Sequence, residues 1–397
     1  MSGNNASLKE KFNENAHAIS KFITNSKKWA RTKPKHLSNI DVSIRRLNKY
    51  GREVNKVLPD LETKPALALF GASQSGKSNM VTNLLKSSDN KFVVYDAKRD
   101  RTLDFAEFIR PPGGGQESTA NLTRFVKHDK DSNRGARPVL IKLCSIKDLL
   151  ISIMVGYYQY QTIDVNEAER SLVLIRKKIE ELRNVSGDRP RNNWLTSEDV
   201  YNIRDFFSLR NIDRNLLLFE NLKNENFWDH LSIAAEYLTN DDLGIFSVFW
   251  NDFNPITTFF KTYFKALQKL DFAHEIYVDF DAVLKDCPEH LSFENYYNIL
   301  YVETLKGSNT KDKDVIVVDH NGMEVELHPS TLCGLVKEVV FSIKSNEDSI
   351  ANEFDILDFP GENTAPDVPI DNNSDHTVLC KMLLRGKVTY MFNSYSK

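Results

Sequence analysis

The chain has little cysteine and no long apolar run. Its 397 residues include four cysteines that lie far apart and do not have zinc-ligand spacing: Cys144, Cys287, Cys333 and Cys380. This excludes a disulfide framework and fits a reducing cytosol. The first residues lack the apolar core of a signal peptide. The most aromatic stretch, residues 245–264, is interrupted by Asp252 and Lys261, which excludes a membrane-spanning helix. We expect a cytoplasmic protein, with peripheral membrane association or delivery to a target cell left open.

The net charge is small but unevenly distributed. The whole chain carries −3, whereas residues 1–65 hold 14 Lys and Arg against 6 Asp and Glu, which gives +8 and leaves −11 for the remainder. Such asymmetry can mark a membrane surface or nucleic acid as partner. We favour packing of the basic segment on the acidic remainder, with membrane contact as the alternative. An acidic core without a basic aromatic stretch argues against nucleic acid.

One glycine-rich segment carries most of the functional information. Residues 71–78 read Gly-Ala-Ser-Gln-Ser-Gly-Lys-Ser, a complete Walker A motif between an apolar run at 66–70, typical of a strand, and a helical pattern at 79–85. In such a loop the backbone N–H groups and the helix N-terminus face phosphates, the lysine reaches the β and γ phosphates, and the hydroxyl ligates Mg²⁺. The alternative is a turn that binds nothing. The predicted nucleotide-binding residues are Gly71, Ser73, Gln74, Ser75, Gly76, Lys77, Ser78 and Asn79.

A second motif follows a short apolar strand at residues 354–357. Asp358-Phe359-Pro360-Gly361 is the Asp-x-x-Gly pattern that P-loop GTPases place opposite the phosphate loop. There the aspartate holds Mg²⁺ and the glycine N–H meets the γ-phosphate. We therefore predict roles for Asp358 and Gly361. The alternative is an ordinary turn at a strand end, because Pro-Gly is a turn dipeptide.

A switch threonine is expected between these motifs. Residues 113–125 begin with three glycines, which permit an order–disorder change, and offer Thr119 and Thr123. We choose Thr123 as the Mg²⁺ ligand, with Thr119 as the competitor. Arg124 could act as an electrostatic finger or simply face solvent. Gln74, inside the phosphate loop, is the choice for orienting the attacking water.

The remaining patterns predict the domain organisation. Residues 1–64 show the periodicity of a basic helical hairpin. Residues 65–144 and 350–397 are expected to form the nucleotide-binding domain, with a last, exposed edge strand at 388–392. Residues 145–349 are predicted to be a mostly helical insertion with aromatic core fillers, a β-hairpin at about 315–327 around Asn321-Gly322, and a helix from Ser330 to about Ile343.

Together these motifs resemble dynamin-like GTPases, which carry a Thr-Arg switch and a later Asp-x-Pro-Gly. They are more similar still to bacterial virulence factors of the SrfC type. Those proteins share the phosphate loop of residues 71–78, the Pro-Pro-Gly-Gly-Gly of 111–115 leading to Thr-Arg-Phe at 123–125, the Leu-Asp-Phe-Pro-Gly of 357–361, and the Leu-Arg-Gly-Lys-Val of 384–388.

This resemblance implies an α/β P-loop NTPase, with an incomplete dynamin-like G domain, a helical insertion and an N-terminal hairpin. It implies Mg²⁺-dependent binding and hydrolysis of GTP or ATP, GTP being favoured, and protein partners or self-association. The alternatives are a non-enzymatic, nucleotide-gated binding module of a virulence or defence complex, and an ATPase. The Asn/Thr-Lys-x-Asp motif that reads guanine does not follow Gly361, and the sequence ends 36 residues later. We therefore expect similar, modest affinity for GTP and ATP.

Overall fold

The computed structural model describes fifteen segments of the chain. They are residues 2–32, 40–62, 64–71, 76–86, 91–109, 119–128, 137–160, 167–185, 187–210, 217–284, 298–307, 314–319, 321–344, 349–361 and 375–395. The chain divides into two compact units, Met1–Ala66 and Leu67–Lys397. Each unit is described by itself.

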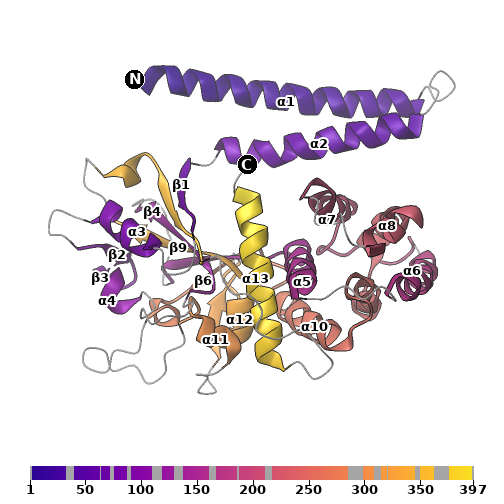
Figure 1. Cartoon of the computed structure of the whole chain (residues 1–397). Helices are drawn as coiled ribbons and strands as arrows, with labels where there is room; N and C mark the ends of the chain where they lie inside the picture. Colours follow the sequence, from indigo (N-terminus) through magenta and orange to yellow (C-terminus); the bar gives the residue numbers. More distant parts are fainter. Residues whose placement is uncertain are drawn as a thin grey trace. The chain divides into compact units, whose positions relative to one another are not determined.

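The first unit is a helical hairpin (Figure 1), as its periodicity predicts. Helix α1 (Ser2–Thr32) pairs with helix α2 (Ile40–Glu62). Ile23 and Ala30 are buried, and a Cβ at Gly51 would meet Ile23 at 3.6 Å, an ordinary contact distance. Lys27 Nζ donates a hydrogen bond to Asn48 Oδ1 at 3.0 Å. An apolar seam and the Lys27–Asn48 hydrogen bond therefore help to hold the two helices together.

The second unit is built on one eight-stranded sheet, whose strand order is β1-β10-β4-β9-β5-β6-β7-β8. Strand β4 runs parallel to β9 and antiparallel to β10, and the pairs from β9 through β8 are antiparallel. The strands are β1 (Ala66–Leu69), β4 (Leu122–Lys127), β5 (Val139–Leu143), β6 (Glu275–Val278), β7 (Val315–Val318), β8 (Glu324–Leu327), β9 (Val336–Ile343) and β10 (Asp355–Asp358). A separate antiparallel pair joins β2 (Val93–Asp96) to β3 (Arg101–Asp104).

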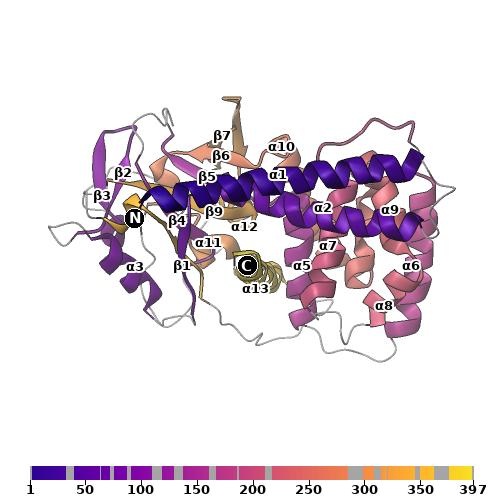
Figure 2. The ribbon, with the colours of Figure 1, turned by 90° about the horizontal axis from the view of Figure 1, so that it is seen from above.

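Helices gather at one end of this unit and strands at the other (Figure 2). The α-helices are α3 (Lys77–Leu85), α4 (Phe105–Phe108), α5 (Ile146–Tyr160), α6 (Glu167–Arg183), α7 (Ser197–Arg210), α8 (Leu217–Asn224), α9 (Phe227–Ala234), α10 (Asn254–Lys269), α11 (Val302–Lys306), α12 (Pro329–Leu335) and α13 (His376–Tyr395). The 3₁₀ turns are η3 (Ala235–Tyr237), η4 (Asn240–Trp250), η5 (Phe280–Ala282) and η6 (Ile350–Asn352). Most aromatic residues of the helical region, Trp250 and Phe260 among them, are buried as core fillers, as predicted, whereas Phe206 is only partly buried.

The predicted helix from Ser330 to Ile343 is wrong in its second half. Helix α12 ends at Leu335, and the chain continues directly as β9. Strand β9 is central in the sheet and buried along almost all its length, so its apolar residues do not alternate regularly with polar ones, and periodicity alone cannot separate it from a buried helix. Because β6 to β9 lie in the same sheet as β4 and β5, residues 145–349 are not a separate helical insertion.

The predicted edge strand at residues 388–392 is also wrong, because these residues lie inside helix α13. Leu379, Leu383 and Met391 are buried at helical spacing. Gly386 lets α13 approach α5 so closely that a Cβ there would stand 1.8 Å from the Ser152 carbonyl oxygen. Tertiary packing therefore overrides the local strand preference of Val388 and Tyr390. The sheet instead ends at β1, where Leu67 is exposed.

Among the described residues, none of the helices combines the length and the apolar character needed to cross a membrane.

Candidate functional site

The segment between β1 and α3 brings a lysine and a glycine into a phosphate-loop-like arrangement. Gly76 precedes α3 with φ of +87°, a left-handed conformation that L side chains rarely adopt. Lys77 Nζ donates a hydrogen bond to the Gly71 carbonyl oxygen at 2.8 Å, so its side chain folds back over the start of the loop. The predicted residues Ser73, Gln74 and Ser75 lie outside the described residues.

The two sequence motifs meet in space. Ser78 Oγ donates a hydrogen bond to Asp358 Oδ2 at 2.7 Å, although 280 residues separate them. Next to this bond, the rings of Phe70 and Phe359 lie 4.2 Å apart between centroids. The end of β1 and the end of β10 are therefore held side by side, and the hydroxyl of one motif directly contacts the carboxylate of the other.

Thr123 joins these residues from strand β4. It is the Cα partner of Asp358 in the antiparallel β4–β10 pair, so both side chains leave the sheet on the same face. The predicted location is different, because Thr123 is 3% exposed in a strand paired on both sides rather than part of a flexible loop. Thr119 forms an isolated bridge with Tyr301. The glycines 113–115 lie outside the described residues.

The two remaining predicted residues lie at the rim of this cluster. Asn79 is exposed on the first turn of α3, one residue after Ser78. Gly361 is half-buried and follows Asp358 by three residues, at the end of a described segment. Their positions place the backbone of both segments beside the Ser78–Asp358 bond.

Arg124 is neither a finger nor a solvent-facing residue. Its guanidinium binds Glu338 through Nε at 2.6 Å and Nη2 at 3.2 Å, and binds Asp355 through Nη1 at 3.1 Å. Because neighbouring residues of a strand point to opposite faces, Arg124 lies on the face away from Thr123. Glu338 is fully buried, and its Oε1 also forms an ion pair with Lys142 Nζ at 3.1 Å. Arg124 therefore ties β4 to its two neighbouring strands.

A buried lysine supports the start of β4 and was not predicted from the sequence. Lys387 Nζ donates to Asn121 Oδ1 at 2.7 Å, and to the Cys333 and Gly334 carbonyl oxygens at 3.3 and 3.2 Å. Burial lowers the pKa of the Lys387 ammonium. Asn121 stands two residues before Thr123. The Leu-Arg-Gly-Lys-Val segment therefore has a structural task, in which Gly386 allows close helix packing and Lys387 anchors the strand that carries Thr123.

The chemistry of the cluster suits a hard cation. Its side-chain donors are the Ser78 and Thr123 hydroxyls and the Asp358 carboxylate, all oxygen, which is the ligand type that Mg²⁺ prefers. Within the described part of the chain, no three His, Cys, Asp or Glu side chains come together as a metal cluster. A single carboxylate fits Mg²⁺ bound together with substrate phosphates and water, rather than a metal cage made by the protein alone.

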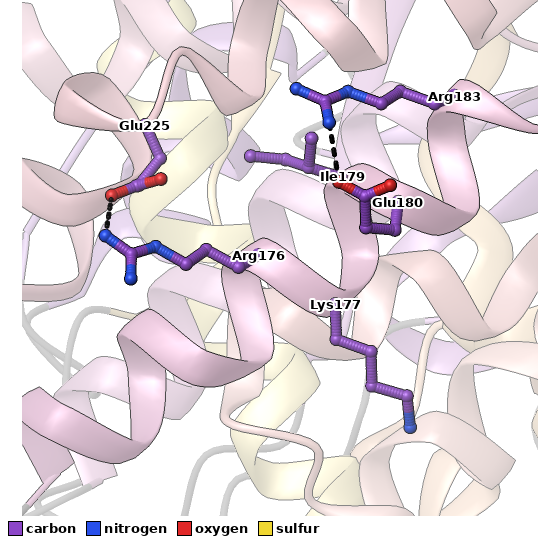
Figure 3. Close-up of a pocket in the computed structure, with 6 residues that line it drawn as sticks. All are labelled: Arg176, Lys177, Ile179, Glu180, Arg183 and Glu225. Carbon is purple, nitrogen blue, oxygen red and sulfur yellow. Dashed lines mark hydrogen bonds and ion pairs between the residues drawn. The ribbon is translucent and has the colours of Figure 1, made fainter.

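A surface groove lies elsewhere, on helix α6 (Figure 3). It has a volume of about 390 Å³ and is lined by Arg176, Lys177, Ile179, Glu180, Arg183 and Glu225. Arg176 pairs with Glu225 at 2.9 Å and Arg183 with Glu180 at 2.6 Å, while Lys177 points away from both pairs. Two of its three cations are thus paired with its two carboxylates, and it contains no residue of the Ser78–Asp358 cluster.

Comparison with known proteins identifies the family. The search of curated proteins and the search of solved structures both found no match. Residues 24–397, nearly the whole chain, match the family described as "Putative bacterial virulence factor". The chain therefore belongs to this bacterial virulence factor family.

Proposed function

We propose that this virulence-factor-family protein binds a nucleoside triphosphate with Mg²⁺ and hydrolyses it, with GTP as the expected substrate. The observation that carries the proposal is the 2.7 Å hydrogen bond between Ser78 and Asp358, with Thr123 paired opposite Asp358. Three motifs far apart in sequence thus supply the side chains that a phosphate and metal site requires. The neighbouring order β1-β10-β4 supports a P-loop NTPase fold of dynamin-like, SrfC-like type.

Each residue has a defined task in this proposal. Gly71 and Gly76 permit the loop conformation, and the backbone N–H groups at the start of α3 face the phosphates. Lys77 leaves the Gly71 carbonyl and binds the β and γ phosphates. The Gly361 N–H faces the γ-phosphate. Water attacks the γ-phosphorus, the bond to the bridging oxygen breaks, and the diphosphate leaves as charge builds on oxygens near Lys77.

The oxygen donors at the cluster fit a magnesium ion. Ser78 and Thr123 would hold it directly, and Asp358 would support it through Ser78 or through water. When bound, Mg²⁺ neutralises charge on the β and γ phosphates. The protein's own contribution is to fix the two hydroxyls, one on the first turn of α3 and one on the buried strand β4.

The direct test is binding and turnover of GTP and ATP by this chain, with and without Mg²⁺. Lys77→Ala should weaken triphosphate binding by about tenfold or more, because one cation and its charge-assisted hydrogen bonds are lost. Lys86→Ala is the matched control, since it removes the same charge at the other end of α3. Unchanged triphosphate affinity in a folded Lys77→Ala protein would show that this loop is not the site.

A second candidate is a non-enzymatic module that is gated by bound nucleotide and acts in a virulence or defence complex. The observation in its favour is that Thr123 is held in a paired, buried strand, which suits a fixed ligand better than a mobile switch. Tight Mg²⁺-dependent binding without turnover would support this module over an enzyme. Competition between GTP and ATP separates a GTPase from an ATPase.

A further inference from the structure

We infer that the exposed apolar side of helix α1 is a docking surface for anionic lipid membranes. The observation is a row of large apolar side chains that the helical hairpin leaves outside its own seam. Phe12, Ile19, Phe22 and Trp29 are 56%, 49%, 68% and 54% exposed. Ile23 and Ala30, which face the hairpin seam, are each only 4% exposed. Phe12, Ile19, Phe22 and Trp29 are named here the α1 stripe, which runs along the helix next to the hairpin seam.

The spacing of the stripe places its members on one side of the helix. Phe12 and Ile19 are seven residues apart, as are Phe22 and Trp29, and Ile19 precedes Phe22 by three. At 3.6 residues per turn these positions form one continuous band. A contiguous band of four large, exposed apolar side chains rimmed by polar residues marks an interaction site, whereas single exposed apolar residues do not.

The charge of the hairpin selects an anionic partner. Residues 1–65 carry +8, and the exposed Lys21 and Lys28 directly precede Phe22 and Trp29 in the same helix. Aromatic residues on one face and lysines on the polar face are the pattern of a helix that lies in a membrane interface. Two copies of this hairpin would instead bring two strongly positive surfaces together, which argues against a second copy as the occupant.

The polar residues within the stripe also favour a membrane over a partner helix. Asn15 and Ser26 fall between its apolar members, at positions that a partner helix would have to bury in a coiled-coil core. A headgroup region keeps such side chains hydrated while the aromatic rings enter the acyl boundary. A basic interfacial helix therefore explains the whole row, polar members included.

Tryptophan fluorescence provides a specific test on the full chain. Of the four tryptophans, Trp29 is exposed, whereas Trp194, Trp228 and Trp250 are buried. Phosphatidylcholine vesicles with about 30% phosphatidylserine should shift the emission to the blue, and brominated lipid should quench it. Pure phosphatidylcholine should do neither, and about 0.5 M NaCl should weaken the effect because salt screens the lysines.

Variants then locate the contact. Phe22→Ser with Ile19→Ser should reduce co-sedimentation with anionic vesicles by about tenfold or more, because two large apolar side chains no longer enter the interface. Val173→Ser with Ile233→Ser is the matched control, since these exposed apolar residues lie on α6 and α9. Circular dichroism checks that α1 stays helical in both.

Three results would overturn the inference. The first is equal loss of vesicle binding in both pairs of variants, or no binding at all. The second is failure of acrylamide to quench Trp29 in the free protein, which would mean that another part of this chain covers the stripe. The third is a concentration-dependent dimer that the Ile19 and Phe22 changes abolish, which would make a second copy the occupant.

Discussion

Replacing Gly386 by alanine should destabilise the second unit strongly, although the same change usually stabilises a helix. Gly386 lies inside α13, where alanine would gain about 1 kcal/mol in helix propensity. Its Cβ would however stand 1.8 Å from the Ser152 carbonyl oxygen and 2.8 Å from the Gly156 nitrogen on α5. Both are backbone atoms, so a change of side-chain rotamer cannot relieve the clash.

The magnitude follows from how far the helices must separate. Reaching an ordinary contact distance requires a shift of about 1.6 Å, and forced repacking of this kind costs roughly 1–3 kcal/mol. The shift would also stretch the bonds from Lys387 to Asn121 and to the Cys333 and Gly334 carbonyls. Losing a charged hydrogen bond costs about 1.5–3 kcal/mol. We expect a net loss of about 1.5–5 kcal/mol, a large part of the stability of a typical domain.

Urea denaturation followed by tryptophan fluorescence measures this loss, because three of the four tryptophans are buried in the second unit. Gly51→Ala is the matched control, since its Cβ would meet Ile23 at 3.6 Å without a clash. It should leave the hairpin unchanged or more stable by up to about 1 kcal/mol, measured by far-ultraviolet circular dichroism. A Gly386→Ala protein as stable as the wild type would refute the close packing of α5 and α13.

Three further predictions concern the site and its support. Thr123→Ala should preserve diphosphate binding but impair Mg²⁺-dependent hydrolysis in a phosphate-release assay, because its hydroxyl acts with the γ-phosphate in place; if Thr119→Ala alone has this effect, the assignment is off by four residues. Burial alone would raise the pKa of Asp148, but Lys337, Lys147 and a hydrogen bond from Tyr390 outweigh it and hold that pKa well below its usual value. The stability from Asp148 is therefore present above about pH 4 and lost as the pH falls further. Asp148→Asn should lower the free energy of unfolding by about 2–4 kcal/mol at pH 7, and by progressively less in urea titrations below pH 4. A difference in unfolding free energy between the variant and the wild type that does not change with pH would contradict the ion pair. GTP and ATP should compete for binding with similar affinity, and a preference for GTP of more than about a hundredfold would mean that residues not identified here read the base.

The sequence predicted the elements whose apolar spacing is regular. The helical hairpin predicted for residues 1–64 is present as α1 and α2, and the hairpin around Asn321-Gly322 is present as β7 and β8. It failed for residues 336–343 and 388–392, where the choice between helix and strand depends on packing partners far along the chain. No local rule reveals that Gly386 must touch Ser152.

The same limit applies to the candidate site. Ser78 and Asp358 stand out because each belongs to a short motif with its own local pattern, and the structure brings them into contact. The place of Arg124 could not be predicted, because Glu338 and Asp355, which hold it, lie more than 200 residues away. The buried position of Lys387 could not be predicted either, because a charged residue is normally expected at the surface and the three acceptors of Lys387 come from other elements.

The central claim, that the two motifs form one magnesium and phosphate site, is tested most directly by a double-mutant cycle. Binding of a non-hydrolysable triphosphate with Mg²⁺ is measured by calorimetry for the wild type, Ser78→Ala, Asp358→Asn and the double variant. Each single change should weaken binding by about 10- to 100-fold, and the double variant should be little weaker than the worse single one, because both changes disable the same bound ion. Strictly additive losses, or single variants that bind as tightly as the wild type, would contradict the claim.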